Sequence, residues 1–216
     1  MADGFGPLTR WAVPRSDADA IFSGAELAIA ETIMRRYRVS DLNLLFAAAL
    51  AVWADRNGHV CVDLNRVAEV TGRVDVPSAA DISKSLVDHP TIVEFVDVAV
   101  SPTLKTAQAF TRPLVKVGQR LYTQRQVINE ISVAEQLRAR ASRVDDISTP
   151  AARLLIESQI APRQLADGST YTVQGDAARA MLQKPFAVLT GGPGTGKTHT
   201  LTRSLFALAS AMYERG

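Results

Sequence analysis

The sequence lacks the features that mark disulfide-stabilised, membrane-spanning and exported proteins. It has one cysteine, Cys61, in 216 residues, so no disulfide can form within the chain, as is usual in a reducing compartment. The longest apolar run, residues 44–54, is well short of the roughly 20 residues that span a bilayer. Residues 1–15 lack the basic-then-apolar order of a signal peptide. We therefore expect a cytoplasmic protein without a membrane partner, and a buried helix at residues 44–54.

The chain also has no large excess of charge of either sign. The chain has 24 basic and 22 acidic residues and a formal net charge of +2, which excludes a broad attraction to nucleic acid or to membranes. Any contact with DNA must be local. The three histidines have no metal-ligand spacing, and the 47% hydrophobic content is enough for a core in one or two domains.

One stretch has a chemistry that can be named, because residues 191–198 match the pattern G-x-x-x-x-G-K-[ST]. An apolar run at 186–190 predicts a buried strand before it, and a helical pattern over 198–213 follows. Such a strand-to-helix turn aims backbone N–H groups and the positive end of the helix dipole at a phosphate. The predicted nucleotide-binding residues of this stretch are Gly191, Gly192, Pro193, Gly194, Thr195, Gly196, Lys197 and Thr198.

Two of these residues are the predicted catalytic residues. Lys197 would reach the β and γ phosphates of ATP as a point charge, and the Thr198 hydroxyl would hold the Mg²⁺ that bridges them. The alternative is a glycine-rich turn that matches by accident, which composition alone allows in roughly one chain of this length in a hundred. The strand and helix patterns on either side make an accident rarer still.

Hydrophobic periodicity predicts a mixed chain. Helices are expected over residues 26–37, 41–56, 63–72, 78–89, 124–141, 150–159, 174–184 and 198–213, and strands over 59–62, 92–100, 114–117, 120–123 and 186–190. The strands at 114–117 and 120–123 form a β-hairpin about Gly118, while residues 101–113 are expected to be a loop. A non-periodic segment at 142–150 indicates a domain boundary, which we place at residue 145.

Three segments resemble the RecD family, the alpha subunits of exodeoxyribonuclease V. Residues 58–64, GHVCVDL, are similar to the family's N-terminal GHVCLDL segment. Residues 113–130 follow its PLV…LY…R…E pattern. Gln174 and the apolar run before residues 191–198 resemble its Q-motif helix and the approach to Walker A. The three segments occur in the family's order, so the resemblance covers most of the chain.

The resemblance implies an α+β fold in two parts. Residues 1–145 would be a mainly helical partner-docking domain with a β-hairpin. Residues 146–216 would be the first strand and helix of a RecA-like P-loop α/β domain, left incomplete. It also implies ATP and Mg²⁺ as cofactors, with Gln174 contacting the adenine edge through its carboxamide.

The implied activity is that of a superfamily 1 helicase moving 5′ to 3′ on single-stranded DNA, in double-strand-break repair and recombination. Its partners would be RecB-like and RecC-like subunits of a heterotrimer, with the DNA strand entering from a duplex end. Nuclease chemistry belongs to the RecB-like subunit in this family, and the sequence has no carboxylate cluster typical of a two-metal nuclease.

A helicase also needs an acidic pair, an arginine finger and a second RecA-like lobe, which we do not find in the 216 residues. We therefore expect an N-terminal fragment that is inactive alone. Two other interpretations stay open: a different P-loop NTPase, such as an AAA-type ATPase or a nucleotide kinase, and a non-enzymatic docking module.

Overall fold

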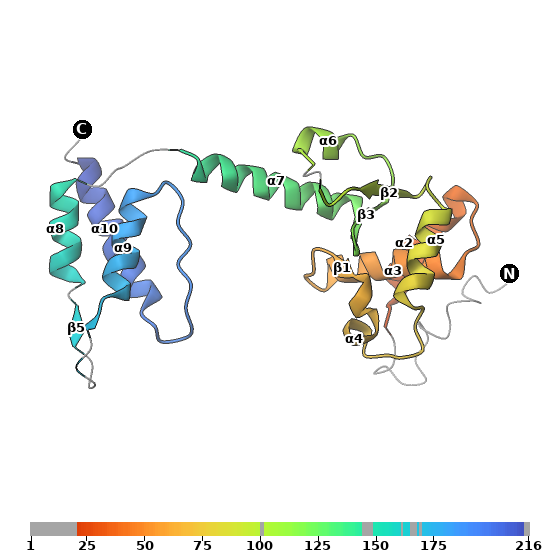
Figure 1. Cartoon of the computed structure of the whole chain (residues 1–216), viewed down its shortest axis with the longest axis horizontal. Helices are drawn as coiled ribbons and strands as arrows, with labels where there is room; N and C mark the ends of the chain where they lie inside the picture. Colours follow the sequence, from red (N-terminus) through yellow and green to blue (C-terminus); the bar gives the residue numbers. More distant parts are fainter. Residues whose placement is uncertain are drawn as a thin grey trace. The chain divides into compact units, whose positions relative to one another are not determined.

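The computed structural model describes residues 21–99, 102–143, 149–160, 162–164, 168 and 170–213. The chain forms two compact units that divide between Glu135 and Gln136 (Figure 1). Much of the predicted boundary segment, including residue 145, lies outside the described residues. No helix in the described part of the chain has the length and apolar character that crossing a membrane requires.

The first unit contains most of the helices and one sheet. Its elements in chain order are α2 (Gly24–Tyr37), α3 (Leu42–Arg56), β1 (Val62–Asp63), η1 (Leu64–Arg66), α4 (Val67–Thr71), α5 (Ala79–Asp88), β2 (Val93–Val96), α6 (Leu104–Gln108), β3 (Leu114–Val117), β4 (Arg120–Thr123) and α7 (Gln124–Ala141), within which the division falls. Most of these elements coincide with the predicted ones.

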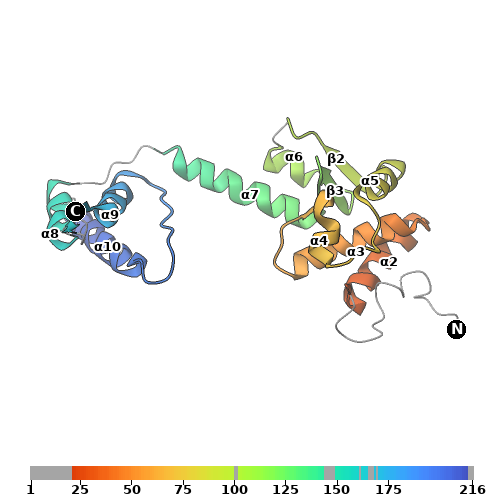
Figure 2. The same ribbon diagram turned by 60° about the horizontal axis from the view of Figure 1, so that its bottom comes forward.

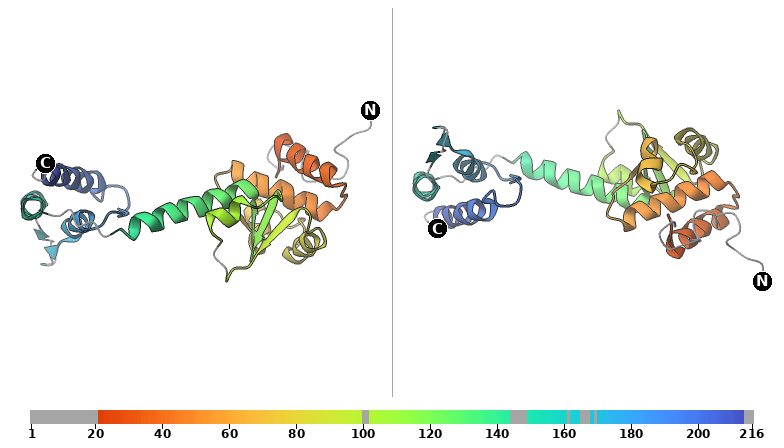
Figure 3. Two further views of the ribbon diagram at one scale, coloured as in Figure 1. Left: turned by 90° about the horizontal axis from the view of Figure 1, so that it is seen from above. Right: turned by 90° about the horizontal axis from the view of Figure 1, so that it is seen from below.

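Helix α3 lies at the centre of the first unit. Its residues 44–52 and Ala54 are buried, as a helix that is apolar on every side requires. Helix α2 packs on one side of it, and the strands and α5 lie on others (Figure 3). Asp41 begins the helix, since its Oδ1 accepts from the backbone N–H groups of Asn43 and Leu44 at 2.8 and 3.2 Å. The predicted buried helix is confirmed.

The sheet of the first unit has the order β1-β4-β3-β2. The β3–β4 pair is the predicted hairpin, and Gly118 has the positive φ of 57° that its turn requires. Strand β2 pairs with β3 in parallel and keeps only residues 93–96 of the predicted strand at 92–100. The strand predicted at 59–62 forms only from Val62 onward, as β1.

Helix α6 corrects the predicted loop at 101–113. The Thr103 hydroxyl accepts from the backbone N–H of Thr106 at 3.2 Å and begins the helix. Ala107 and Phe110 are then buried in a small cluster with residues of β3, β4 and α7. Five residues are too few to show helical periodicity, so only the threonine cap could have indicated this helix.

The second unit consists mainly of three helices that pack against one another (Figure 1). Its elements are α8 (Pro150–Gln159), β5 (Arg163–Gln164), β6 (Thr170–Tyr171), α9 (Val173–Gln183) and α10 (Lys197–Tyr213). The three predicted helices are confirmed, and Thr149 caps α8, since its Oγ1 accepts from the Ala152 N–H at 3.1 Å. The short antiparallel β5–β6 pair was not predicted.

The prediction of a strand at residues 186–190 is wrong. These residues form no strand and run outside the three packed helices (Figure 2), with Val188 71% exposed. A strand buried on both faces needs neighbouring strands for its backbone hydrogen bonds, and the described residues of this unit offer only the two-residue β5 and β6. The start of a RecA-like sheet is therefore not formed here.

Helix α10 packs mainly through small side chains rather than through Leu201 and Leu205. Thr200, Ser204 and Ala207 are buried, whereas Leu201 and Leu205 are 41% and 54% exposed. Small side chains let the helices α8 and α9 approach closely, and Leu208 is partly buried against the same cluster.

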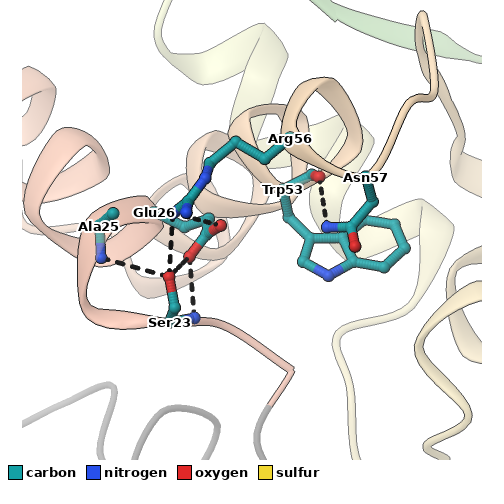
Figure 4. A network of polar contacts seen from close by, with 6 residues as sticks. All are labelled: Ser23, Ala25, Glu26, Trp53, Arg56 and Asn57. Atoms are coloured by element: carbon teal, nitrogen blue, oxygen red, sulfur yellow. Dashed lines mark hydrogen bonds and ion pairs between the residues drawn. The ribbon is translucent and has the colours of Figure 1, made fainter.

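A polar network joins the start of α2 to the end of α3 (Figure 4). Glu26 is only 3% exposed, and Arg56 Nη1 lies 2.9 Å from its Oε1. The Ser23 N–H donates to Glu26 Oε2 at 2.8 Å, which completes a capping box. Burial by itself would raise the pKa of Glu26, but the hydrogen bonds from Ser23 and the charge of Arg56 hold it below its usual value.

Replacing Arg56 tests this network. We expect Arg56→Ala to lower the free energy of unfolding by about 1 kcal/mol at neutral pH, because buried Glu26 loses its cation while the half-exposed Arg56 is partly screened. Urea denaturation measures the change. The control Arg66→Ala removes an exposed ion pair with Glu69 and should leave the stability nearly unchanged.

The stability difference between wild type and Arg56→Ala should also depend on pH, in a direction that the pKa of Glu26 determines. Because the folded pKa of Glu26 lies below its unfolded value, its charge stabilises the fold above the unfolded pKa, and this contribution is lost as pH falls through the folded pKa. The difference in free energy of unfolding between wild type and Arg56→Ala should therefore be smaller in acid than at neutral pH. An equal difference in acid and at neutral pH would show that the ion pair is not its cause.

Candidate nucleotide-binding site

The predicted phosphate loop lies between α9 and α10. Gly194 and Gly196 have φ angles of 75° and 78°, a left-handed backbone that other residues rarely adopt. Thr195 Oγ1 donates to the Gly192 carbonyl at 2.9 Å and tightens the turn. The two glycines at these positions are thus required by the backbone path of the loop.

Lys197 is the first residue of α10 and folds back over the loop. Its Nζ donates to the Gly191 and Gly192 carbonyls at 2.5 and 2.6 Å. The Lys197 side chain therefore links the end of the glycine-rich segment to its start. The structure brings Lys197 together with the backbone of the residues predicted to bind phosphate.

Thr198 lies in the first turn of α10, where the unpaired N–H groups and the dipole of a helix favour an anion. Its side chain is exposed, and we find no hydrogen bond to its hydroxyl among the residues that the structure describes. The hydroxyl is therefore available to a metal ion bound to phosphate. The described residues contain no group of three His, Cys, Asp or Glu side chains that could hold a metal by themselves.

Gln174 reaches the loop from another helix. It is the second residue of α9, and its Nε2 donates to the Thr195 carbonyl at 3.0 Å. A Cβ atom added to Gly196 would collide with this amide nitrogen. The structure thus places Gln174 beside residues 195 and 196, although they lie more than twenty positions further along the chain.

A hollow of about 370 Å³ opens beside Thr198, a size within the range of small-molecule sites. Arg203 Nη1 donates to Gln159 Oε1 at 2.8 Å across it, which joins α10 to α8. The residues that line it are Gln159, Thr198, His199, Thr202, Arg203 and Phe206. Apart from Thr198, sequence reasoning did not assign these residues to a site. The i, i+4 spacing along α10 was the available signal for Thr198, Thr202 and Phe206.

Comparison with known proteins bears on the family. A family model described as the RecBCD enzyme subunit RecD, N-terminal domain, matches residues 18–122. The RecBCD enzyme subunit RecD of Mycolicibacterium smegmatis is 32% identical over 190 residues, which cover 88% of this chain and 30% of the relative. The protein of the same name from Mycobacterium tuberculosis H37Rv is 28% identical over 193 residues, 86% of this chain and 28% of the relative.

This chain thus spans less than a third of the length of the curated relatives it matches. The matched family region includes the GHVCVDL segment and ends within the PLV…LY pattern, at Tyr122. The predicted resemblance is confirmed, and residues 18–122 belong to the family of RecD N-terminal domains.

Proposed function

We propose that this chain is the ATP-binding N-terminal part of a RecD-like subunit, a 5′-to-3′ DNA helicase of superfamily 1. The observation that carries the proposal is that one chain contains both a RecD N-terminal domain and a glycine-rich loop. Lys197 and Thr198 of this loop begin a long helix. The whole protein would act in double-strand-break repair and recombination, in the cytoplasm.

In the proposed site, different residues would contact the phosphates and Mg²⁺. Backbone N–H groups of residues 194–198 would surround the phosphates of ATP, and Lys197 would leave the Gly191 and Gly192 carbonyls to contact the β and γ phosphates. Thr198 would hold Mg²⁺, which neutralises charge on the phosphates. Gln174, which the family resemblance assigned to the adenine edge, lies beside this loop and donates to the Thr195 carbonyl.

The proposed partners follow from the names of the relatives, which are subunits of RecBCD enzymes. We propose that the first unit docks on a RecC-like subunit, in a heterotrimer that also contains a RecB-like subunit. Single-stranded DNA from a duplex end would be the substrate of the assembled helicase. The 216-residue chain alone is expected to bind ATP without hydrolysing it, since it supplies neither an acidic pair nor an arginine finger.

Nucleotide binding is tested by Lys197→Ala. We expect ATP affinity to fall about ten- to a hundredfold, because one lysine makes charge-assisted contacts worth roughly 1.5–3 kcal/mol. Isothermal titration calorimetry with Mg-ATP measures the change. Lys184→Ala, at the end of α9, is the matched control and should bind as wild type does. Equal affinities of wild type and Lys197→Ala would contradict the proposed site.

Docking is tested by co-purification with RecB-like and RecC-like subunits. We expect the full chain and its Lys197→Ala variant to be retained equally, because the docking unit lies before the phosphate loop. Loss of retention in Lys197→Ala would contradict this separation of roles. A chain that is retained by the subunits but binds no ATP would favour the non-enzymatic docking module over the proposed helicase part.

A further inference from the structure

The hydrogen bond between Gln174 and the phosphate loop has a directional consequence. Gln174 Nε2 donates to the Thr195 carbonyl at 3.0 Å, so this carbonyl points toward the start of α9. Carbonyl and N–H lie on opposite sides of a trans peptide, and the described chain contains no cis peptide bond. The N–H of Gly196 therefore points away from α9 and from Gln174.

The orientation of the Gly196 N–H matters because it is one of the loop's backbone donors. Among the described residues we find no acceptor for it, whereas the neighbouring Thr195 hydroxyl and Lys197 ammonium are bonded to carbonyls of the loop. Gly196 also leaves space that the Gln174 amide occupies, since a Cβ atom there would collide with Nε2. Glycine and glutamine therefore fit together at this point.

We propose that Gln174 is a positioning residue for the phosphate loop, which it holds so that the Gly196 N–H faces the bound phosphate. This rests on the proposed nucleotide-binding function. This positioning role differs from the adenine contact that the family resemblance implies, because the amide N–H of Gln174 donates to the loop backbone. Gln174 then contributes equally to every ligand that carries the phosphate chain, with or without a base.

Two ligands separate positioning from base reading. Mg-ATP and magnesium tripolyphosphate share the phosphate chain, but only ATP has a base and a ribose. We expect Gln174→Ala, in the full 216-residue chain, to weaken both by a similar factor of about three to ten, the value of one hydrogen bond. Calorimetric titration measures both affinities. A loss confined to ATP, or no loss for either ligand, would overturn the proposal.

A second variant and an NMR measurement distinguish the loss of the Gln174–Thr195 hydrogen bond from misfolding of the Gln174→Ala variant. Gln174→Glu cannot donate to the Thr195 carbonyl once ionised, so both ligands should be weakened at least as much as by alanine. Gln183→Ala, at the exposed end of α9, is the matched control and should leave both affinities unchanged. Wild-type affinity in Gln174→Glu would also count against positioning.

The amide of Gly196 reports on the proposed contact directly. In ¹⁵N-labelled wild type, tripolyphosphate should shift this amide resonance, because its N–H meets the phosphate. The shift should be reduced in Gln174→Ala and kept in Gln183→Ala, and an unchanged shift in Gln174→Ala would overturn the proposal. If wild type binds neither ligand, the proposed nucleotide-binding function itself fails, an outcome distinct from normal binding by Gln174→Ala.

Discussion

The burial of α3 is the constraint on which the first unit depends. A helix whose residues 44–52 are all apolar or small and inaccessible to water must be covered on every side. Helix α2, helix α5 and the strands provide that cover, and the capping of α3 by Asp41 sets where it begins. The polar network of Glu26 and Arg56 then joins α2 to the far end of α3.

The candidate site depends on a different kind of constraint, which is local. Positive φ angles at Gly194 and Gly196, and the folding of Lys197 over its own loop, arise within a few residues of the chain. Gln174 comes from further away, and its bond to the Thr195 carbonyl links the loop to α9. The loop can therefore keep its shape while the strand expected before it is absent.

Elements with a strong local signal were predictable, and elements that need a partner were not. Hydrophobic periodicity located α2, α3, α5, α7 and α8, and Gly118 located the hairpin. Helix α6 is too short to show a period. Residues 186–190 have the apolar composition of a strand, but no described strand lies beside them to form a ladder.

By itself the sequence determined the phosphate-loop motif, the buried character of residues 44–54 and the RecD resemblance, because each depends only on short segments and their order along the chain. Only the tertiary structure decided which face of α10 packs and where Gln174 points. Periodicity identifies a helix but not its neighbours. Here α8 and α9 cover Thr200, Ser204 and Ala207 and leave Leu201 and Leu205 exposed. The contact of Gln174 with Thr195 likewise requires α9 and the loop to be packed together.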